Sequence, residues 1–157
     1  MGSPFDRLNF DPQLAREFLA EFARYEFALK AAGFAAGDNK RVDADWDAYA
    51  QAIDGGFTKL QNADLYTAVN YLIKQPPKKQ VLINGKLDWR DAPPDANLPC
   101  AQQVILMVRR VRNNLFHGGK FYPAADAARD HLLVSYSLVV LRACLPLHPD
   151  LKREYES

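Results

Sequence analysis

The chain has 157 residues, of which 48% are hydrophobic and 25% are charged, and its 20 basic and 19 acidic residues give a net charge of +1. This length suits one domain, and this composition excludes a wholly disordered chain, which would need low hydrophobicity and a high net charge. A net charge close to zero also excludes an overall field that draws the protein onto nucleic acid or a membrane. We therefore expect a single domain over residues 1–157, in which any contact with a polyanion comes from a local cluster of basic side chains.

The first predicted element is an amphipathic helix. Asp11 is a good N-cap residue and Pro12 suits a first helical turn, whereas Gly33 should end the helix. Apolar residues recur along this helix at steps of three and four, which places them on one face. They are Leu14, Phe18, Phe22, Tyr25 and Leu29. Residues 37–40 should then form a loop.

The next two predicted elements are helices near residues 43–53 and over residues 62–74. Two consecutive glycines, Gly55 and Gly56, should end the first helix, and the prolines after Gln75 should end the second. Each helix has one apolar face. The inward residues are Trp46, Tyr49 and Ile53 on the first helix and Leu65, Val69, Leu72 and Ile73 on the second.

The segment from Val81 to Trp89 does not have a helical pattern. Two short runs flank Asn84 and Gly85, and Asn-Gly is the strongest two-residue signal for a hairpin turn. An isolated hairpin is only marginally stable in water, so this one should pack on the helices. The alternative is an ordered loop over the same residues.

Two long helices are predicted over residues 101–116 and 125–145. Gly118 and Gly119 should end the first of them. The second is apolar on almost every face, which indicates a central, buried position within the chain or against a partner subunit. The residues from His148 onward indicate a polar tail with room for one helical turn. The predicted fold class is therefore all-α, a single-domain bundle of about five helices with a short hairpin or ordered loop inserted between the third and the fourth.

The sequence also bears on the compartment of the protein. No apolar run reaches the roughly 18 uninterrupted residues of a membrane span, because the richest run, residues 132–147, contains two serines and Arg142. The N-terminus has no basic region followed by an apolar one, so we expect no secretory signal. Cys100 and Cys144 are too few for a disulfide scaffold. We therefore expect a cytoplasmic protein with reduced cysteines and no contact with a membrane.

The helix predicted over residues 101–116 has two different sides. At about 100° per residue, one narrow sector is apolar and should face the core. This core seam consists of Val104, Val108, Val111 and Leu115. Arg109, Asn113 and His117 are spaced by four residues and form a polar row on the opposite side, with Arg112 beside it.

An imidazole, a guanidinium and an amide at one end of a helix suit the cleavage of RNA. The reaction needs a group that takes the proton of the 2′-hydroxyl and a group that protonates the leaving 5′-oxygen, and histidine suits either role near neutral pH. A planar guanidinium can stabilise the crowded phosphorane through two hydrogen bonds. Asn113 can orient the phosphate or the histidine ring, and the two glycines after His117 let a nucleotide approach closely. This scheme requires no metal and no cofactor.

The same residues carry a resemblance to a known family. Residues 112–117 read Arg-Asn-Asn-Leu-Phe-His, which resembles the Arg-Asn-x-x-x-His signature of the HEPN superfamily (higher eukaryotes and prokaryotes nucleotide-binding). The Gly-Gly-Lys run that follows is also typical of it, and residues 22–34 resemble the opening helix of small standalone prokaryotic members. Members of this superfamily are small α-helical bundles, many of them metal-independent endoribonucleases of toxin–antitoxin modules, CRISPR effectors and phage-defence systems.

The resemblance implies a homodimer in which the arginines and histidines of two protomers converge on one composite site. It implies a metal-independent endoribonuclease, a hydrolase acting on single-stranded or looped RNA, with a biological role as a toxin or antiviral-defence effector restrained by a cognate antitoxin or regulatory protein. The expected site residues are Arg112, Asn113 and His117 for catalysis and Arg109, Asn114 and Lys120 for substrate binding.

Other interpretations of these residues stay open at this point. Leu106 and Phe116 border the polar row away from the core seam, which favours a two-fold dimer built on the fourth and fifth helices. His117 can instead cap a helix C-terminus, and the arginines can form a solvated basic face. Glu26 can orient an arginine of the fourth helix or pair with Lys30. The alternative for the whole protein is a non-catalytic module that binds nucleotide or RNA, or an antitoxin or scaffold, with the same fold.

Overall fold

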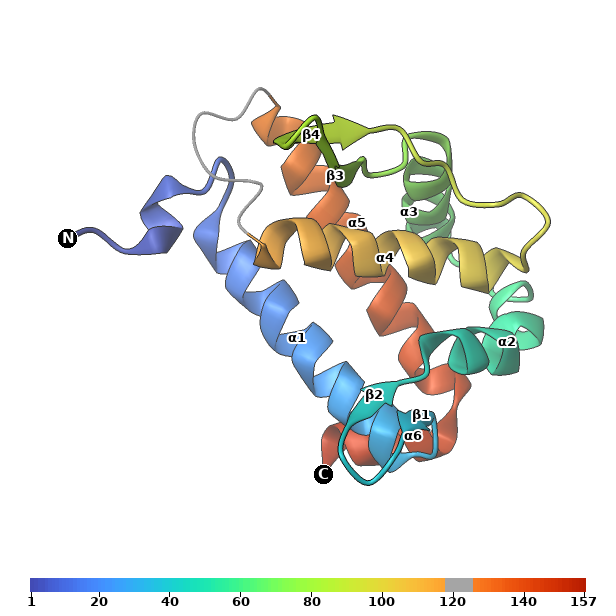
Figure 1. The fold of residues 1–157 in the computed structure, drawn as a ribbon. Coiled ribbons are helices and arrows are strands. Elements are labelled where there is room, and N and C mark those ends of the chain that lie inside the picture. The colour runs from blue at the N-terminus through green and yellow to red at the C-terminus, as the bar shows by residue number, and fades with distance from the viewer. Residues whose placement is uncertain (118–125) are drawn as a thin grey trace.

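The computed structural model of the protein describes residues 1–117 and 126–157, which form six α-helices and two small antiparallel sheets (Figure 1). The helices are α1 (Pro12–Ala31), α2 (Trp46–Phe57), α3 (Ala63–Lys74), α4 (Cys100–Phe116), α5 (Ala127–Cys144) and α6 (Pro149–Glu156). The strands are β1 (Ala35–Gly37), β2 (Val42–Ala44), β3 (Lys79–Ile83) and β4 (Lys86–Arg90). Short 3₁₀ turns lie at Pro4–Arg7 and Leu145–Leu147.

The prediction of an all-α bundle of about five helices is wrong, because the described chain has a sixth helix and two β-hairpins. The sixth helix, α6, has 8 residues and forms where a polar tail with room for one helical turn was expected. His148 caps its N-terminus, accepting a hydrogen bond at Nδ1 from the Leu151 amide at 3.3 Å, and the Leu151 side chain is fully buried. One buried leucine and a histidine cap therefore fix this short helix against the domain.

The unexpected hairpin, β1–β2, has its turn in the loop predicted over residues 37–40, and β2 covers Asp43 and Ala44, where the second helix was expected to begin; that helix starts at Trp46 instead. Its strands are three residues long and almost fully exposed, so they lack the apolar alternation by which strands are recognised. The turn depends on local chemistry instead. The Asp38 carboxylate accepts hydrogen bonds from the amides of Lys40 and Arg41, and Gly37 has a φ of +152°, where a Cβ would collide with the Arg41 carbonyl.

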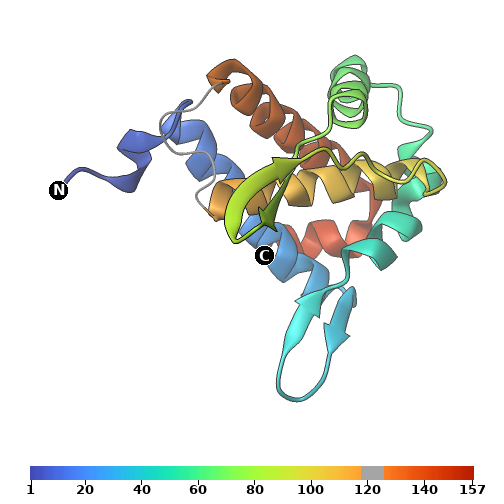
Figure 2. The same ribbon diagram turned by 45° about the horizontal axis from the view of Figure 1, so that its top comes forward.

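The hairpin expected between the third and fourth helices is confirmed as β3–β4. The two strands pair from Lys79 opposite Arg90 to Ile83 opposite Lys86. Asn84 and Gly85 make the turn with φ values of +49° and +73°, as a two-residue hairpin loop with two left-handed residues requires. Figure 2 shows this hairpin lying along the C-terminal half of α4, whereas β1–β2 projects away from the helices.

Helix α5 lies at the centre of the fold and packs against α1, α3 and α4. Its apolar faces are largely covered by these helices of the same chain, so its composition does not require a partner subunit. Among the described residues, one segment, Ala127–Leu147, is long and apolar enough to cross a membrane by length and composition alone. This segment packs against three helices of the same chain, and the central helix of a helical bundle has the same length, composition and packing.

Helix α2 continues through the two glycines that were expected to end it. It ends at Phe57, whose side chain is buried in the core and holds the last turn in place. Asp54 on the same helix accepts a hydrogen bond from the Ala101 amide at 3.0 Å, which caps the N-terminus of α4. Because burial and a tertiary cap outweigh glycine's weak helix propensity, α2 extends past its sequence signal.

The core contains an aromatic cluster from α1 and α2 with a buried hydroxyl network inside it. The Tyr25 and Tyr49 hydroxyls are hydrogen-bonded at 2.6 Å, and Tyr49 donates to the Cys144 carbonyl at 3.2 Å. Burial raises the pKa of both tyrosines well above the ordinary value of 10.0, and burial also raises the pKa of the Cys144 thiol to about 12. These three groups stay protonated in the folded protein at pH values where the unfolded chain ionises them.

The pKa shifts of these three groups predict an alkaline instability. Because each pKa is raised on folding, its contribution to stability is fully present below the pKa of the unfolded chain and is lost as pH rises toward the folded-state pKa. Above about pH 9 the unfolding free energy should fall, by up to about 1.4 kcal/mol per pH unit for each group. Urea unfolding at a series of pH values measures this slope.

A matched control is Tyr25→Phe, which removes one of the ionising groups and leaves the Tyr49 hydroxyl bonded to the Cys144 carbonyl. The variant should lose stability with pH less steeply than the wild type. An alkaline slope that is identical in the two proteins would show that Tyr25 does not contribute to it.

Candidate functional site

Helix α4 positions the candidate site because its two sides differ as the sequence predicts. All four residues of the core seam, Val104, Val108, Val111 and Leu115, are buried. With this side held in the core, the polar row faces outward. The Arg109 side chain is half-buried, and Asn113 and His117 are exposed. His117 ends the helix, and its amide donates to the Asn113 carbonyl at 3.0 Å.

A cleft of about 330 Å³ opens between α4 and the start of β3. This volume is at the lower end of the range of small-molecule sites. The whole polar row lines it, and among the described residues no Asp or Glu side chain does. The lining residues are Lys79, Gln80, Leu106, Arg109, Arg110, Asn113, Asn114 and His117. The cleft thus combines cationic and amide groups with one imidazole, a set that suits an anionic ligand.

The structure places Arg112 beside this cleft rather than in its lining. Its guanidinium lies over the rings of Phe22, 5.2 Å from the centroid, and Phe116, 4.9 Å from the centroid. One nitrogen, Nη1, donates to Asn113 Oδ1 at 2.9 Å. Two cation–π contacts and one hydrogen bond therefore hold the Arg112 fork in a fixed orientation next to the polar row.

The other predicted substrate-binding residues have different surroundings. Arg109 lies in the cleft, with Nη1 3.9 Å from Asp47 Oδ1. Asn114 also lines the cleft, but it is 6% exposed and its amide nitrogen donates to the Lys78 carbonyl at 2.8 Å. Asn114 therefore holds the chain at the start of β3 as well as facing the cleft. Lys120 lies outside the residues that the structure describes, and so do the two glycines after His117.

Arg110 connects α4 to both ends of the β3–β4 hairpin. Its Nη1 donates to the Pro77 carbonyl, just before β3, at 3.0 Å, and to the Ala92 carbonyl, just after β4. The guanidinium is half-buried, and burial lowers its pKa. Because both arms of the hairpin meet at this one side chain, Arg110 fixes the wall that closes the cleft opposite α4.

The comparisons with known proteins provide no relative. No protein-family model, no curated protein and no solved structure matches this chain. Within the described residues, no group of three or more His, Cys, Asp and Glu side chains could hold a metal ion. A function for this chain therefore rests on the residues of the cleft and their geometry.

Sequence reasoning missed three members of this site: Lys79, Gln80 and Arg110. No sequence motif links the hairpin to α4, because they are joined by a tertiary contact between side chains and carbonyls. The one usable signal was the expectation that an isolated hairpin must pack on the helices. Glu26, which was expected to orient an arginine or pair with Lys30, accepts a hydrogen bond from Trp46 Nε1 at 3.2 Å.

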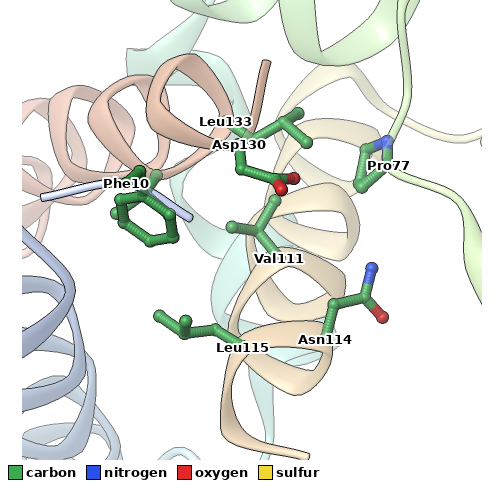
Figure 3. A pocket seen from close by; sticks show the side chains of 8 residues that line it. Phe10, Pro77, Val111, Asn114, Leu115, Asp130 and Leu133 are labelled. Carbon is green, nitrogen blue, oxygen red and sulfur yellow. The ribbon is translucent and has the colours of Figure 1, made fainter. Parts of the chain in front are cut away.

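A second, much smaller cavity lies between the segment before α1 and helices α4 and α5. Figure 3 shows Phe10, Val111, Leu115 and Asp130 around it. Its volume of about 10 Å³ is that of a single water molecule, so it is a packing defect rather than a ligand site. Asp130 is 6% exposed and accepts a hydrogen bond from Asn9 Nδ2, which ties the N-terminal segment to α5.

The Arg110 clamp predicts a local effect on the hairpin. Arg110→Ala removes the donors to two carbonyls and should destabilise the hairpin by about 1–3 kcal/mol, the cost of leaving such groups without partners. Amide hydrogen exchange over β3 and β4 should speed up while the core of α4 stays protected. The matched control is Arg109→Ala, which removes the same side chain one residue earlier and should leave the hairpin unchanged. Equal exchange in Arg110→Ala and the wild type would contradict the clamp.

Proposed function

We propose that the protein is a metal-independent endoribonuclease of the HEPN type, which cleaves RNA through attack of the 2′-hydroxyl on the adjacent phosphate. One observation carries this proposal: Arg109, Asn113 and His117 open together onto a single cationic cleft, with the Arg112 guanidinium fixed beside it. The cleft supplies groups for binding a phosphodiester and for moving protons. Residues 112–117, which resemble the Arg-Asn-x-x-x-His signature of the HEPN superfamily, lie at this end of α4 and support the proposal.

In the proposed reaction, His117 takes the proton of the 2′-hydroxyl or gives a proton to the leaving 5′-oxygen. Arg112 stabilises the charge on the phosphorane, and Asn113 positions the Arg112 fork through the hydrogen bond at 2.9 Å. Only one Nη1 donor of Arg112 is engaged in this bond, so other N–H groups of the guanidinium remain for phosphate oxygens. Arg109, inside the cleft, binds the substrate backbone.

We further propose that two protomers bring their clefts together as a homodimer in the cytoplasm. Phe116 supports this arrangement, because its side chain is 62% exposed at the end of α4, directly beside the polar row. Sedimentation at micromolar concentration should show a dimer. A monomer at that concentration would count against the composite site. The biological role we propose is that of a toxin or defence effector under the control of a partner protein.

The roles of His117 and Arg112 predict loss of cleavage without loss of folding. His117→Ala should lower the cleavage rate by about 10²–10⁴-fold, as is typical when a general acid–base group is removed. Arg112→Ala should lower it by about 10²–10³-fold, and Arg112→Lys should fail as well, because an ammonium lacks the planar fork. Cleavage rate and melting temperature, measured together for each variant, test this prediction.

Val108→Ala is the matched control on the buried side of the same helix. It should cost roughly 1–3 kcal/mol of stability and leave the cleavage chemistry intact. If His117→Ala keeps full activity at unchanged stability, the nuclease proposal is wrong and a binding module takes its place. If the wild type binds RNA and leaves it intact, the same conclusion follows.

The proposed nucleophile predicts the chemistry of the products. Attack by the 2′-hydroxyl forms the 2′,3′-cyclic phosphate and releases a 5′-hydroxyl end. Cleavage should persist in EDTA, and a single 2′-deoxy nucleotide at the cut site should block it. End-group analysis of the fragments measures this outcome. Cleavage of the 2′-deoxy substrate, or a dependence on added magnesium after chelation, would refute the mechanism.

A further inference from the structure

The β3–β4 hairpin carries a pair of like charges at its open end. Lys79 and Arg90 are direct cross-strand partners, and both side chains are exposed. Within the described residues, neither of them forms an ion pair. Like charges placed directly opposite each other destabilise an antiparallel pair. The free protein therefore holds two like charges on one face of the hairpin at this position.

The neighbouring acidic residues of the hairpin neutralise this pair only in part. Lys78 Nζ lies 3.8 Å from Asp91 Oδ1, so the adjacent acidic residue is already engaged. Asp88 shares the face of Lys79 and Arg90 by strand alternation, and its single negative charge offsets one of the two positive charges; its carboxylate also accepts a hydrogen bond from the Trp89 amide at 2.8 Å. A positive charge density consequently remains at the start of β3.

This charge density is continuous with the cleft. Lys79 lines the cleft together with Arg109, Asn113 and His117. Arg110 and Asn114 hold the base of the hairpin on α4, so Lys79 has a fixed place in the cleft lining and Arg90 lies opposite it on the neighbouring strand. A chain of regularly spaced phosphates that enters the cleft meets this pair next to the polar row.

We propose that the β3–β4 hairpin is the wall on which the RNA backbone binds, and that Lys79 and Arg90 together bind a phosphate next to the one that is cleaved. This inference rests on the proposed ribonuclease function and specifies how that site holds its substrate. A phosphodiester bound between the two side chains places one negative charge between two positive ones, so it offsets part of their repulsion in the free hairpin. Contacts with phosphates position the RNA strand along the protein without recognising its base sequence.

A charge reversal separates binding from stability. Lys79→Glu places a carboxylate opposite Arg90, which should form a cross-strand ion pair and leave the hairpin as stable as in the wild type or more so. The same change removes a cation from the phosphate site and adds an anion. RNA affinity should therefore fall by about 10-fold or more while the melting temperature is unchanged or higher.

The probe is a short, labelled, single-stranded RNA with 2′-O-methyl groups, which the proposed chemistry leaves uncleaved, so that fluorescence anisotropy reports binding alone. In Lys79→Ala, the slope of log affinity against log salt concentration should decrease by about 1, as expected when one phosphate contact is lost. The matched control is Lys86→Ala, at the opposite end of the ladder and about 13 Å from Lys79 along the strands. It should retain both the affinity and the salt slope of the wild type.

The possible outcomes distinguish this inference from the proposed function. If the wild type cleaves RNA and Lys79→Glu binds the probe as the wild type does, the hairpin inference is wrong and the nuclease proposal stands. If Lys79→Ala and Lys86→Ala weaken binding equally, the charge acts without a defined phosphate site, and the inference is again wrong. If the wild type neither binds the probe nor cleaves RNA, the proposed function fails and the inference fails with it.

Discussion

The hydrogen bonds from Arg110 to the Pro77 and Ala92 carbonyls are the interaction on which the cleft depends. They bring the two ends of a marginal two-stranded hairpin to one point on α4, and Asn114 adds a third bond to the Lys78 carbonyl. A hairpin without such support would be only marginally stable in water. The cleft is therefore bounded by α4 on one side and by the β3–β4 hairpin on the other. Side chains of the helix join the two by hydrogen bonds to the hairpin backbone.

Helix α4 can serve both as a core element and as the floor of the cleft because its seam and its polar row are separated around the axis. The seam, from Val104 to Leu115, is covered by the rest of the domain, which leaves the row free to face the cleft. Between the two sides, Arg112 lies across the rings of Phe22 and Phe116. This arrangement gives a cation a fixed orientation, and among the described residues no acidic side chain pairs with it and competes with a phosphate.

The fold was predictable where burial imposes a period on the sequence and unpredictable where it does not. The inward faces of α1, α2 and α4 were correct because aromatic and aliphatic residues recur every three or four positions. The hairpin β1–β2 was missed because its short, exposed strands have no apolar period. The extension of α2 through its glycines and the full length of α6 were missed because Phe57 and Leu151 act through tertiary burial.

The sequence by itself determined the helical core, the turn of the second hairpin at Asn84, and the polar row of Arg109, Asn113 and His117, because these depend on residue spacing and local backbone chemistry. Only the tertiary structure decided that Lys79 joins this row, that Arg110 clamps the hairpin, and that Arg112 lies beside the cleft rather than in it. These features arise from contacts between segments that are far apart in the chain or from the rotamer that packing selects, and neither leaves a period in the sequence.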